Sequence, residues 1–275
     1  METWEKEKLV VDRTKEPITK TRLVDDFKKI GLGPGNTVIS HFAMSKIGWI
    51  VGREMSVIEA LMEVLTEEGT LVMPSQTPIP GDPANWNYPP VPESWWQTIR
   101  DEAPIYDPLK TPTTRLGRIP ELFRSYPGVL RSPHPQTPFA AWGKHAADIV
   151  EEHYLELPFG KGSPLEKMYH LDAKVLLVGV GHSNNTALHF AEFSANIPNF
   201  PKKSQGTAMM VNGKRIWKTW EEIDYDSDDF HLLGASYEKK ISYSPVIVGQ
   251  AETRLFSMRE MIPFAITWFE KNRVY

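Results

Sequence analysis

The sequence contains no cysteine among its 275 residues, so disulfide bonds, thiolate metal sites and a cysteine nucleophile are excluded. It has no apolar run near the ~18 residues that a membrane-spanning helix requires. Its first residues, Met1 to Lys8, are charged and lack the apolar segment of a secretory signal. These absences predict a cytoplasmic protein that does not bind membranes.

An excess of positive charge is also missing. The chain has 31 Lys and Arg against 35 Asp and Glu, a formal net charge of −4. Because a phosphate backbone attracts basic surfaces, nucleic acid is not expected as a partner. The mild acidic excess is compatible with a cationic small-molecule substrate. Hydrophobic residues make up 41% and charged residues 24%, which is typical of a globular enzyme.

Apolar runs that alternate with helical patterns predict an α/β fold. Strands are expected at Thr37–Phe42 and Thr70–Met73, with a helix between them that Ser56 and Glu59 would open as a capping box. This βαβ unit predicts a right-handed parallel pair. The continuous apolar run 175–180 predicts a strand buried on both faces. Further helices are expected at 21–30, 116–125, 140–154 and 256–269.

The C-terminal third has a different pattern. Asn212-Gly213 lies between two strand-like segments, 207–211 and 214–217, which favours a β-hairpin. The segment 245–251 also resembles a strand. We therefore predict one α/β domain over residues 1–275, with a mixed central sheet flanked by helices and an antiparallel elaboration in this last third. Residues 1–20 are expected to form a surface arm, and 78–112 a long Pro- and aromatic-rich loop, a type that is usually functional.

Histidines at the carboxyl ends of two predicted strands are the first candidates for catalysis, because ligands bind there in open α/β sheets. His41 follows the first strand. His189 follows the run 175–180, on a helix, with Thr186 three residues before it and Glu192 three after. Residues at i and i+3 share a helix face, so either Glu192 or another carboxylate can orient His189 as a general base. Each histidine, interpreted alone, also fits a structural role in the core or at a strand end.

The loop after the first strand contains three polar or glycine positions that suit an anion. Backbone N–H groups at Ser45, Gly48 and Gly52, together with the helix start at Ser56, are typical of a phosphate site. The loop has neither a GxGxxG nor a GxxxxGK[ST] pattern, so it is not a dinucleotide or Walker motif.

Metal-dependent hydrolysis is the alternative chemistry. His182, His189 and Glu192 are a candidate ligand set, but their spacing fits no HExxH-type motif. The acidic run 224–229 begins like a calcium-binding loop, yet it lacks the glycine at the sixth position and the glutamate at the twelfth. The sequence therefore predicts no metal site.

Blocks of sequence spread in order over roughly residues 15 to 270 carry a family resemblance. They are SHFAMSKIGWIVG from Ser40, LVMPSQT from Leu71, DPLKTPT from Asp107, GRIPELFR from Gly117, PGVLRSPHP from Pro127, FGKGSPL from Phe159 and LLVGVGHSNNTALHFAE from Leu176. Together they resemble the aminoglycoside 3-N-acetyltransferase family, the antibiotic N-acetyltransferases. The resemblance implies a fold unlike that of GNAT acetyltransferases and the transfer of an acetyl group from acetyl-CoA to the 3-amino group of a deoxystreptamine antibiotic.

The resemblance also assigns residues. The important histidines of the family correspond to His41 and His189, and its threonine to Thr186. Its CoA site corresponds to Met44, Ser45, Lys46, Gly48, Trp49, Ile50, Val51 and Gly52, with Thr77 and Thr113 nearby. Because cysteine is absent, direct transfer is expected, with His189 as base and Thr186 or His41 as donor to the oxyanion. Acidic residues that can bind the ammonium groups of the substrate are Asp101, Glu102, Asp107, Asp224 and Asp226.

Three alternatives stay open at this stage. The same fold can acetylate an amine that is not an aminoglycoside, the histidines can serve a metal-dependent hydrolase, or the chain can bind cationic drugs without catalysis. A homodimer is kept as the expectation for the assembly.

Overall fold

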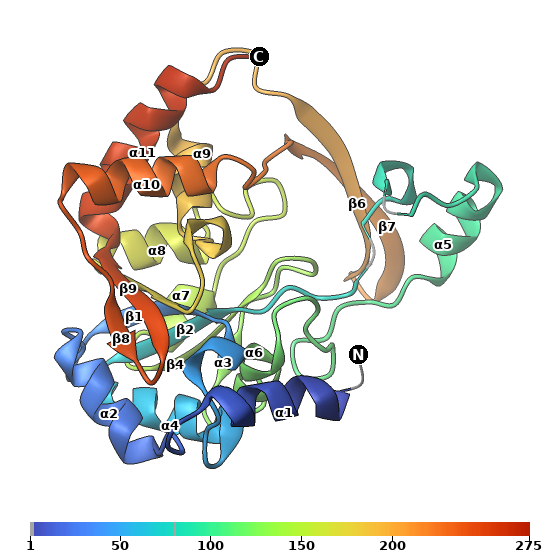
Figure 1. Ribbon diagram of the computed structural model, residues 1–275. Helices are drawn as coiled ribbons and strands as arrows, with labels where there is room; N and C mark the ends of the chain where they lie inside the picture. Colours follow the sequence, from blue (N-terminus) through green and yellow to red (C-terminus); the bar gives the residue numbers. More distant parts are fainter. Residues whose placement is uncertain (1–2, 80, 88) are drawn as a thin grey trace.

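A central mixed sheet with helices on both faces organises the computed structural model, which describes residues 3–79, 81–87 and 89–275 (Figure 1). The predicted arm 1–20 and loop 78–112 therefore each contain positions outside the described residues. The described strands of the sheet lie in the order β3-β4-β2-β1-β5-β9-β8. They are β1 (Thr37–Phe42), β2 (Thr70–Pro74), β3 (Leu130–Arg131), β4 (Phe139–Gly143), β5 (Lys174–Val178), β8 (Val246–Val248) and β9 (Ala251–Ser257).

The middle of this sheet is parallel and its margins are antiparallel. β1 pairs in parallel with β2 on one side and with β5 on the other, while β4 and β9 run antiparallel to their neighbours. The predicted parallel β1–β2 pair and the mixed sheet are confirmed. The carboxyl ends of β1, β2 and β5 meet at one edge of the sheet, so the loops that follow them converge there.

Alternating residues of the buried strands feed two separate cores. Val38 and Leu176 face one core, and Ile39 and Val175 face the other. The first core packs against α2 (Lys20–Lys29), α4 (Arg53–Leu65) and α6 (Arg118–Phe123). The second packs against α7 (Ala146–Val150), α8 (Pro164–His170), α9 (Leu188–Ser194), α10 (Phe230–Lys240) and α11 (Met258–Asn272). A sheet covered on both faces explains the continuous apolar runs of its central strands.

The helix predicted over 140–154 is wrong. The chain instead forms β4, a turn and the short α7, because residues 139–143 pair antiparallel with β2 and tertiary pairing overrides the helix propensity of alanine. Gly143 makes the turn with φ +102°, and a Cβ there would lie 2.1 Å from the carbonyl oxygen of Gly69.

The predicted capping box at Ser56 is also wrong. α4 begins at Arg53, after Gly52 in the left-handed conformation with φ +79°. Ser56 lies inside the helix, where its hydroxyl donates to the carbonyl of Val51 at 2.5 Å. The glycine turn thus places the N-cap at Gly52, four residues before the expected Ser56.

The predicted hairpin is confirmed and is longer than expected. β6 (Lys202–Val211) and β7 (Lys214–Ile223) pair over their full length around Asn212 and Gly213, both with positive φ. They reach away from the central sheet toward the long loop (Figure 1). That loop contains η1 (Pro83–Asn85), η2 (Glu93–Trp95) and α5 (Trp96–Glu102). Arg215 ties the hairpin to α5 by donating to the carbonyls of Arg100 and Ala103 at 2.8 Å.

Two terminal segments differ from the prediction. The strand expected over 245–251 is split into β8 and β9 by a turn at Gly249, whose φ is +61°. The last helix therefore begins at Met258 rather than Phe256.

The arm 1–20 contains a helix, α1 (Thr3–Arg13), which lies beside the short α3 (Met44–Ile47) (Figure 1). Every helix in the described ranges is too short or too polar to cross a membrane.

Candidate active site

His189 and Glu192 form a hydrogen-bonded pair at the start of α9. Nδ1 of His189 lies 2.6 Å from Oε2 of Glu192, and the two side chains are 13% and 0% exposed. A carboxylate only accepts hydrogen bonds, so the proton of a neutral imidazole lies on Nδ1 and the Nε2 lone pair is left available. The predicted i, i+3 contact is thus present, and its geometry is that of an oriented general base.

Glu192 is held from its other side by Arg273, which follows α11. The guanidinium pairs with Oε1 of Glu192, and it also donates to the two carboxylate oxygens of Asp229, at 2.6 and 2.8 Å. Burial lowers the pKa of Arg273, but hydrogen bonds to Asp229 and the charge of Glu192 outweigh it and hold that pKa above its ordinary value. Asp226, expected to contact substrate, also accepts from Arg273, at 3.3 Å, and its backbone N–H donates to Glu192 at 3.0 Å.

An aromatic wall fixes the plane of the His189 ring. Phe159 stacks on it with the ring centroids 4.7 Å apart, and Phe230 and Tyr225 contact it at 4.8 and 5.3 Å. Burial raises the pKa of Tyr225, which stays a neutral phenol. The imidazole is therefore restrained by packing as well as by Glu192.

His41 lies near the carboxyl end of β1, opposite Leu177 of β5. Burial lowers its pKa to about 3, so the ring is neutral at physiological pH. Its Nε2 is buried and has no hydrogen-bond partner among the described residues. A buried orphan nitrogen at a strand end is available to a bound ligand. Thr186 lies two residues before the start of α9, and its carbonyl accepts from the N–H of His189 at 3.1 Å.

The loop after β1 is covered by α1. A cavity of about 300 Å³, which we name the loop cavity, lies between them and is bounded by the loop residues Met44, Ser45, Gly48, Trp49 and Ile50. Lys46, Val51 and Gly52 belong to the same loop but do not line it. Arg53 pairs with Glu7 of α1, and Arg13 donates to the carbonyl of Ser45, which fastens α1 in place.

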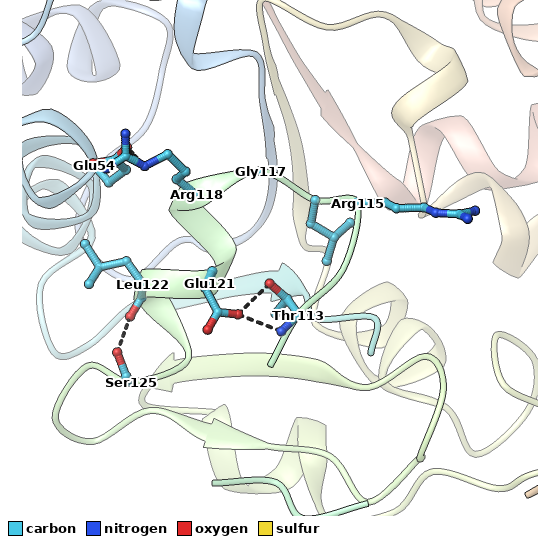
Figure 2. A pocket seen from close by; sticks show the side chains of 9 residues that line it. Glu54, Thr113, Arg115, Gly117, Arg118, Glu121, Leu122 and Ser125 are labelled. Atoms are coloured by element: carbon cyan, nitrogen blue, oxygen red, sulfur yellow. Dashed lines mark hydrogen bonds and ion pairs between the residues drawn. The ribbon is translucent and has the colours of Figure 1, made fainter. Parts of the chain in front are cut away.

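Thr113 and Thr77 line the next two cavities. Thr113 donates to Glu121 through its hydroxyl and its N–H, at 2.7 and 2.6 Å, beside a cavity of about 470 Å³ (Figure 2). Burial raises the pKa of Glu121, but bonds from Arg124 and Thr113 outweigh it and lower that pKa to about 2. Thr77 is buried beside a cavity of about 850 Å³ and accepts from the N–H of Ile79 at 3.1 Å.

These cavities adjoin one another because neighbours share lining residues. Glu54 and Arg118, an ion pair at 2.8 Å, line both the loop cavity and the Thr113 cavity (Figure 2). Leu116 lines both the Thr113 and the Thr77 cavities. Trp86 connects the Thr77 cavity to one of about 550 Å³ at Tyr225, which contacts His189. Neighbouring cavities thus share lining residues from the loop after β1 as far as Tyr225, whose ring contacts His189, while His189 itself lines none of these cavities.

The five predicted substrate acids lie in different places. Asp224 lines the Tyr225 cavity. Asp101 and Glu102 are exposed at the end of α5, and Asp107 caps the following turn by accepting from the N–H of Leu109 at 2.9 Å. None of these three lines a described cavity.

Five residues of the site were missed from the sequence. They are Phe159, Tyr225 and Phe230 against His189, Arg273 behind Glu192, and Lys203 beside Asp224. Tyr225 is the residue between the two flagged acids, so its position was within reach of the sequence. Arg273 gave no local signal, because it is 81 residues from Glu192.

The ligand set of the hydrolase alternative is divided between two networks. His182 lies in the short helix η3 (His182–Asn184) and binds Glu238 of α10 at 3.0 Å, where Arg254 also pairs at 2.6 Å. His189 is committed to Glu192. Within the described ranges, no group of three or more His, Asp or Glu side chains is arranged to hold a metal ion.

Comparison with known proteins places the chain among enzymes. A model of the aminoglycoside 3-N-acetyltransferase family matches residues 39–270. YokD of Bacillus subtilis strain 168, described as a prophage-derived aminoglycoside N(3')-acetyltransferase-like protein, is 44% identical over 266 residues, covering 96% of this chain and 97% of YokD. The crystal structure of YokD gives a TM-score of 0.92, covering 96% of this chain and 98% of that chain.

Two further relatives carry informative names. Aminoglycoside N(3)-acetyltransferase VII of Streptomyces paromomycinus is 32% identical over 280 residues, covering 96% of this chain and 95% of the relative. The solved structure of AAC-IIIb in a binary complex with CoASH is 27% identical, with a TM-score of 0.84, covering 94% and 98% of the two chains. The resemblance and the fold class expected from the sequence are both confirmed: the chain belongs to the aminoglycoside 3-N-acetyltransferase family of enzymes.

Proposed function

We propose that this enzyme transfers the acetyl group of acetyl-CoA to the 3-amino group of an aminoglycoside, with His189 as the general base. The observation that carries the proposal is the His189–Glu192 pair at 2.6 Å, in contact with Tyr225, which lines the last of the cavities that share lining residues. Family membership supports the acceptor, and the CoASH complex of AAC-IIIb supports the donor.

The acetyl donor occupies the cavities that follow the loop after β1, and the aminoglycoside occupies the Tyr225 cavity. In this arrangement residues of the loop Met44–Gly52, with Thr77 and Thr113, hold CoA, and the thioester reaches the end of the series at His189. The shared lining residue Arg115 supplies positive charge along the way, which suits the phosphates of CoA.

Transfer is direct. The unprotonated amine attacks the thioester carbonyl, an N–C bond forms, and Nε2 of His189 accepts the proton that the nitrogen loses. Glu192 stabilises the resulting imidazolium. The C–S bond then breaks, and the thiolate of CoA takes the proton from His189. A general base of this kind contributes ~10²–10⁴-fold in rate.

The carbonyl oxygen becomes negative as the amine attacks and needs a donor. His41, whose low pKa keeps the ring neutral, and the hydroxyl of Thr186 are the two donors that we assign to it. An orphan Nε2 on His41 supports this assignment, because a ligand would supply the partner that the nitrogen lacks among the described residues.

The test is the release of free thiol from acetyl-CoA with a panel of aminoglycosides. Release should require the drug and should collapse in His189→Ala, while His231→Ala, which alters an exposed histidine on α10, should leave it unchanged. CoA binding without thiol release on any drug would redirect the search to other amines. Equal release by His189→Ala would remove the base assignment.

A further inference from the structure

The cavity at Tyr225 has an unusual charge balance for a site that receives a cation. Its volume is about 550 Å³, and its described lining residues come from positions 79 and 81–87, from Gln136, from the start of β6 and from the loop after β7. The charged side chains among its described lining residues are Asp82, Lys203 and Asp224. An ammonium group binds best where a carboxylate has no other partner, so the pairing of these three residues decides what the cavity can recognise.

Both lining carboxylates already have cationic partners. Asp82 accepts two hydrogen bonds from the guanidinium of Arg100, at 2.8 and 3.2 Å, and the Asp82 side chain is only 11% exposed. Asp224 pairs with Nζ of Lys203 at 3.0 Å. Each acid is therefore neutralised by the protein itself.

Lys203 occupies the position that a substrate ammonium would otherwise fill. Its Nζ lies 3.0 Å from Asp224, 3.8 Å from the buried Glu222 and 4.6 Å from the centroid of the Tyr225 ring. Two carboxylates and one aromatic face are the contacts that a bound ammonium group seeks. The side chain is 25% exposed, so the lysine is held inside the cavity wall.

The remaining recognition groups of the cavity are neutral. They are the amide side chains of Asn85, Asn87, Gln136 and Gln205, which all line the cavity. The Gln205 side chain accepts from the N–H of Asp82 at 2.8 Å and so also joins the long loop to the hairpin. Amide groups of this kind donate to and accept from hydroxyls. The cavity thus offers hydrogen bonds without a free negative charge.

We propose that Lys203 is a specificity-determining residue, which makes the cavity beside His189 select a hydroxyl-rich part of an amino sugar or aminocyclitol and reject an additional ammonium group there. The inference rests on the proposed function, because it concerns the acceptor that His189 deprotonates. The substrate class is an amine whose other cationic groups lie outside this cavity.

The experiment uses two aminoglycosides that differ by a single exchange of an amino group for a hydroxyl on the ring next to the acetylated one. Binding of each to the full chain is measured by calorimetry, and turnover by thiol release. The wild-type enzyme should bind the hydroxyl member at least as tightly as the amino member. Lys203→Met should tighten the amino member selectively, by roughly five- to tenfold, because Asp224 becomes available.

Glu222 does not complicate this result. Its side chain is buried and does not line the cavity, and burial raises its pKa, whereas Asp224 lines the cavity and lies nearer to Lys203. Lys202→Met is the matched control, since it removes an exposed lysine from the same strand and should leave the preference unchanged. Lys203→Arg keeps the positive charge and should retain the wild-type preference. This second variant still tests the inference if Lys203→Met folds poorly.

The inference fails if Lys203→Met weakens both members equally, or if Lys203→Arg changes the preference as much as the methionine variant does. Both results are read in an enzyme that turns over aminoglycosides, so they leave the proposed function intact. If the wild-type enzyme neither binds nor acetylates either member, the proposed function fails and this inference fails with it.

Discussion

Arg273 is ion-paired with Oε1 of Glu192 across 81 residues of sequence, while the other oxygen of that carboxylate meets His189. Both Arg273 and Glu192 are nearly inaccessible to solvent, with side chains 5% and 0% exposed. Arg273, which follows α11, therefore anchors the Glu192 carboxylate that orients the proposed base.

Replacing Arg273 with methionine should damage both stability and turnover. Glu192 would become a buried charge without its cationic partner, which costs about 3–5 kcal/mol. We expect a loss of that size in urea unfolding and a fall in kcat without a matching rise in KM. Arg259→Met removes an exposed arginine from α11 and should change neither quantity. Unaltered kcat in a folded Arg273→Met enzyme would show that the anchor has no catalytic effect.

Glu192→Gln tests the orientation of His189 with little change in shape. The amide can still contact Nδ1, but it cannot stabilise an imidazolium by charge. We expect kcat to fall by ~10²-fold or more, within the range that a general base contributes, with KM nearly constant. Steady-state kinetics at saturating acetyl-CoA measure this. A loss that appears only in KM would place Glu192 in substrate binding instead.

His41→Ala should lower kcat by ~10²–10³-fold, the usual loss when one oxyanion donor is removed. Because burial holds the pKa of His41 at about 3, the ring stays neutral, and its removal should not shift any inflection of the kcat–pH profile above about pH 5. The measurement is the kcat–pH profile of the variant and of the wild type over pH 5–9. A lost inflection near neutrality would mean that His41 itself titrates in the reaction.

The burial of His134 should make the free energy of unfolding depend on pH, independently of catalysis. Its side chain is buried against His153, with the ring centroids 4.6 Å apart, and burial lowers its pKa from 6.5 to about 4. The unfolded chain therefore binds a proton that the folded chain does not between those two values. Stability should fall as pH decreases through that window, by ~3 kcal/mol from this group.

The measurement is urea unfolding of the wild type and His134→Asn between pH 7 and pH 4.5. The variant should lose less stability on acidification than the wild type, although it starts from a lower value. His231→Asn, at an exposed position, should follow the wild-type curve. Parallel curves for all three proteins would show that His134 does not carry the effect.

Local patterns in the sequence were sufficient for much of the fold and for the centre of the site. The runs of β1 and β5 are continuous because the sheet is covered on both faces, and the spacing of His189 and Glu192 on one helix predicts their contact. The parts that failed depend on distant residues. The segment 139–143 is a strand because β2 pairs with it, and α4 starts early because Gly52 makes a left-handed turn.

The walls of the site could not be derived locally for the same reason. Lys203 of the hairpin contacts Asp224, and Tyr225 in the loop after the hairpin contacts His189. Arg273, which follows the last helix, contacts Glu192. No spacing rule links these segments, and α10, which covers His182, went unpredicted. The roles of Thr77, Thr113 and the loop residues Met44–Gly52 toward CoA stay predictions from the family resemblance.

The most direct test of the account is to identify the acetylated nitrogen in the product that the enzyme makes from acetyl-CoA and an aminoglycoside, by NMR. The account predicts a single acetyl group on the 3-amino nitrogen, formed by the wild type and not by His189→Ala. An acetyl group on another nitrogen, or the same product at an equal rate from His189→Ala, would contradict it.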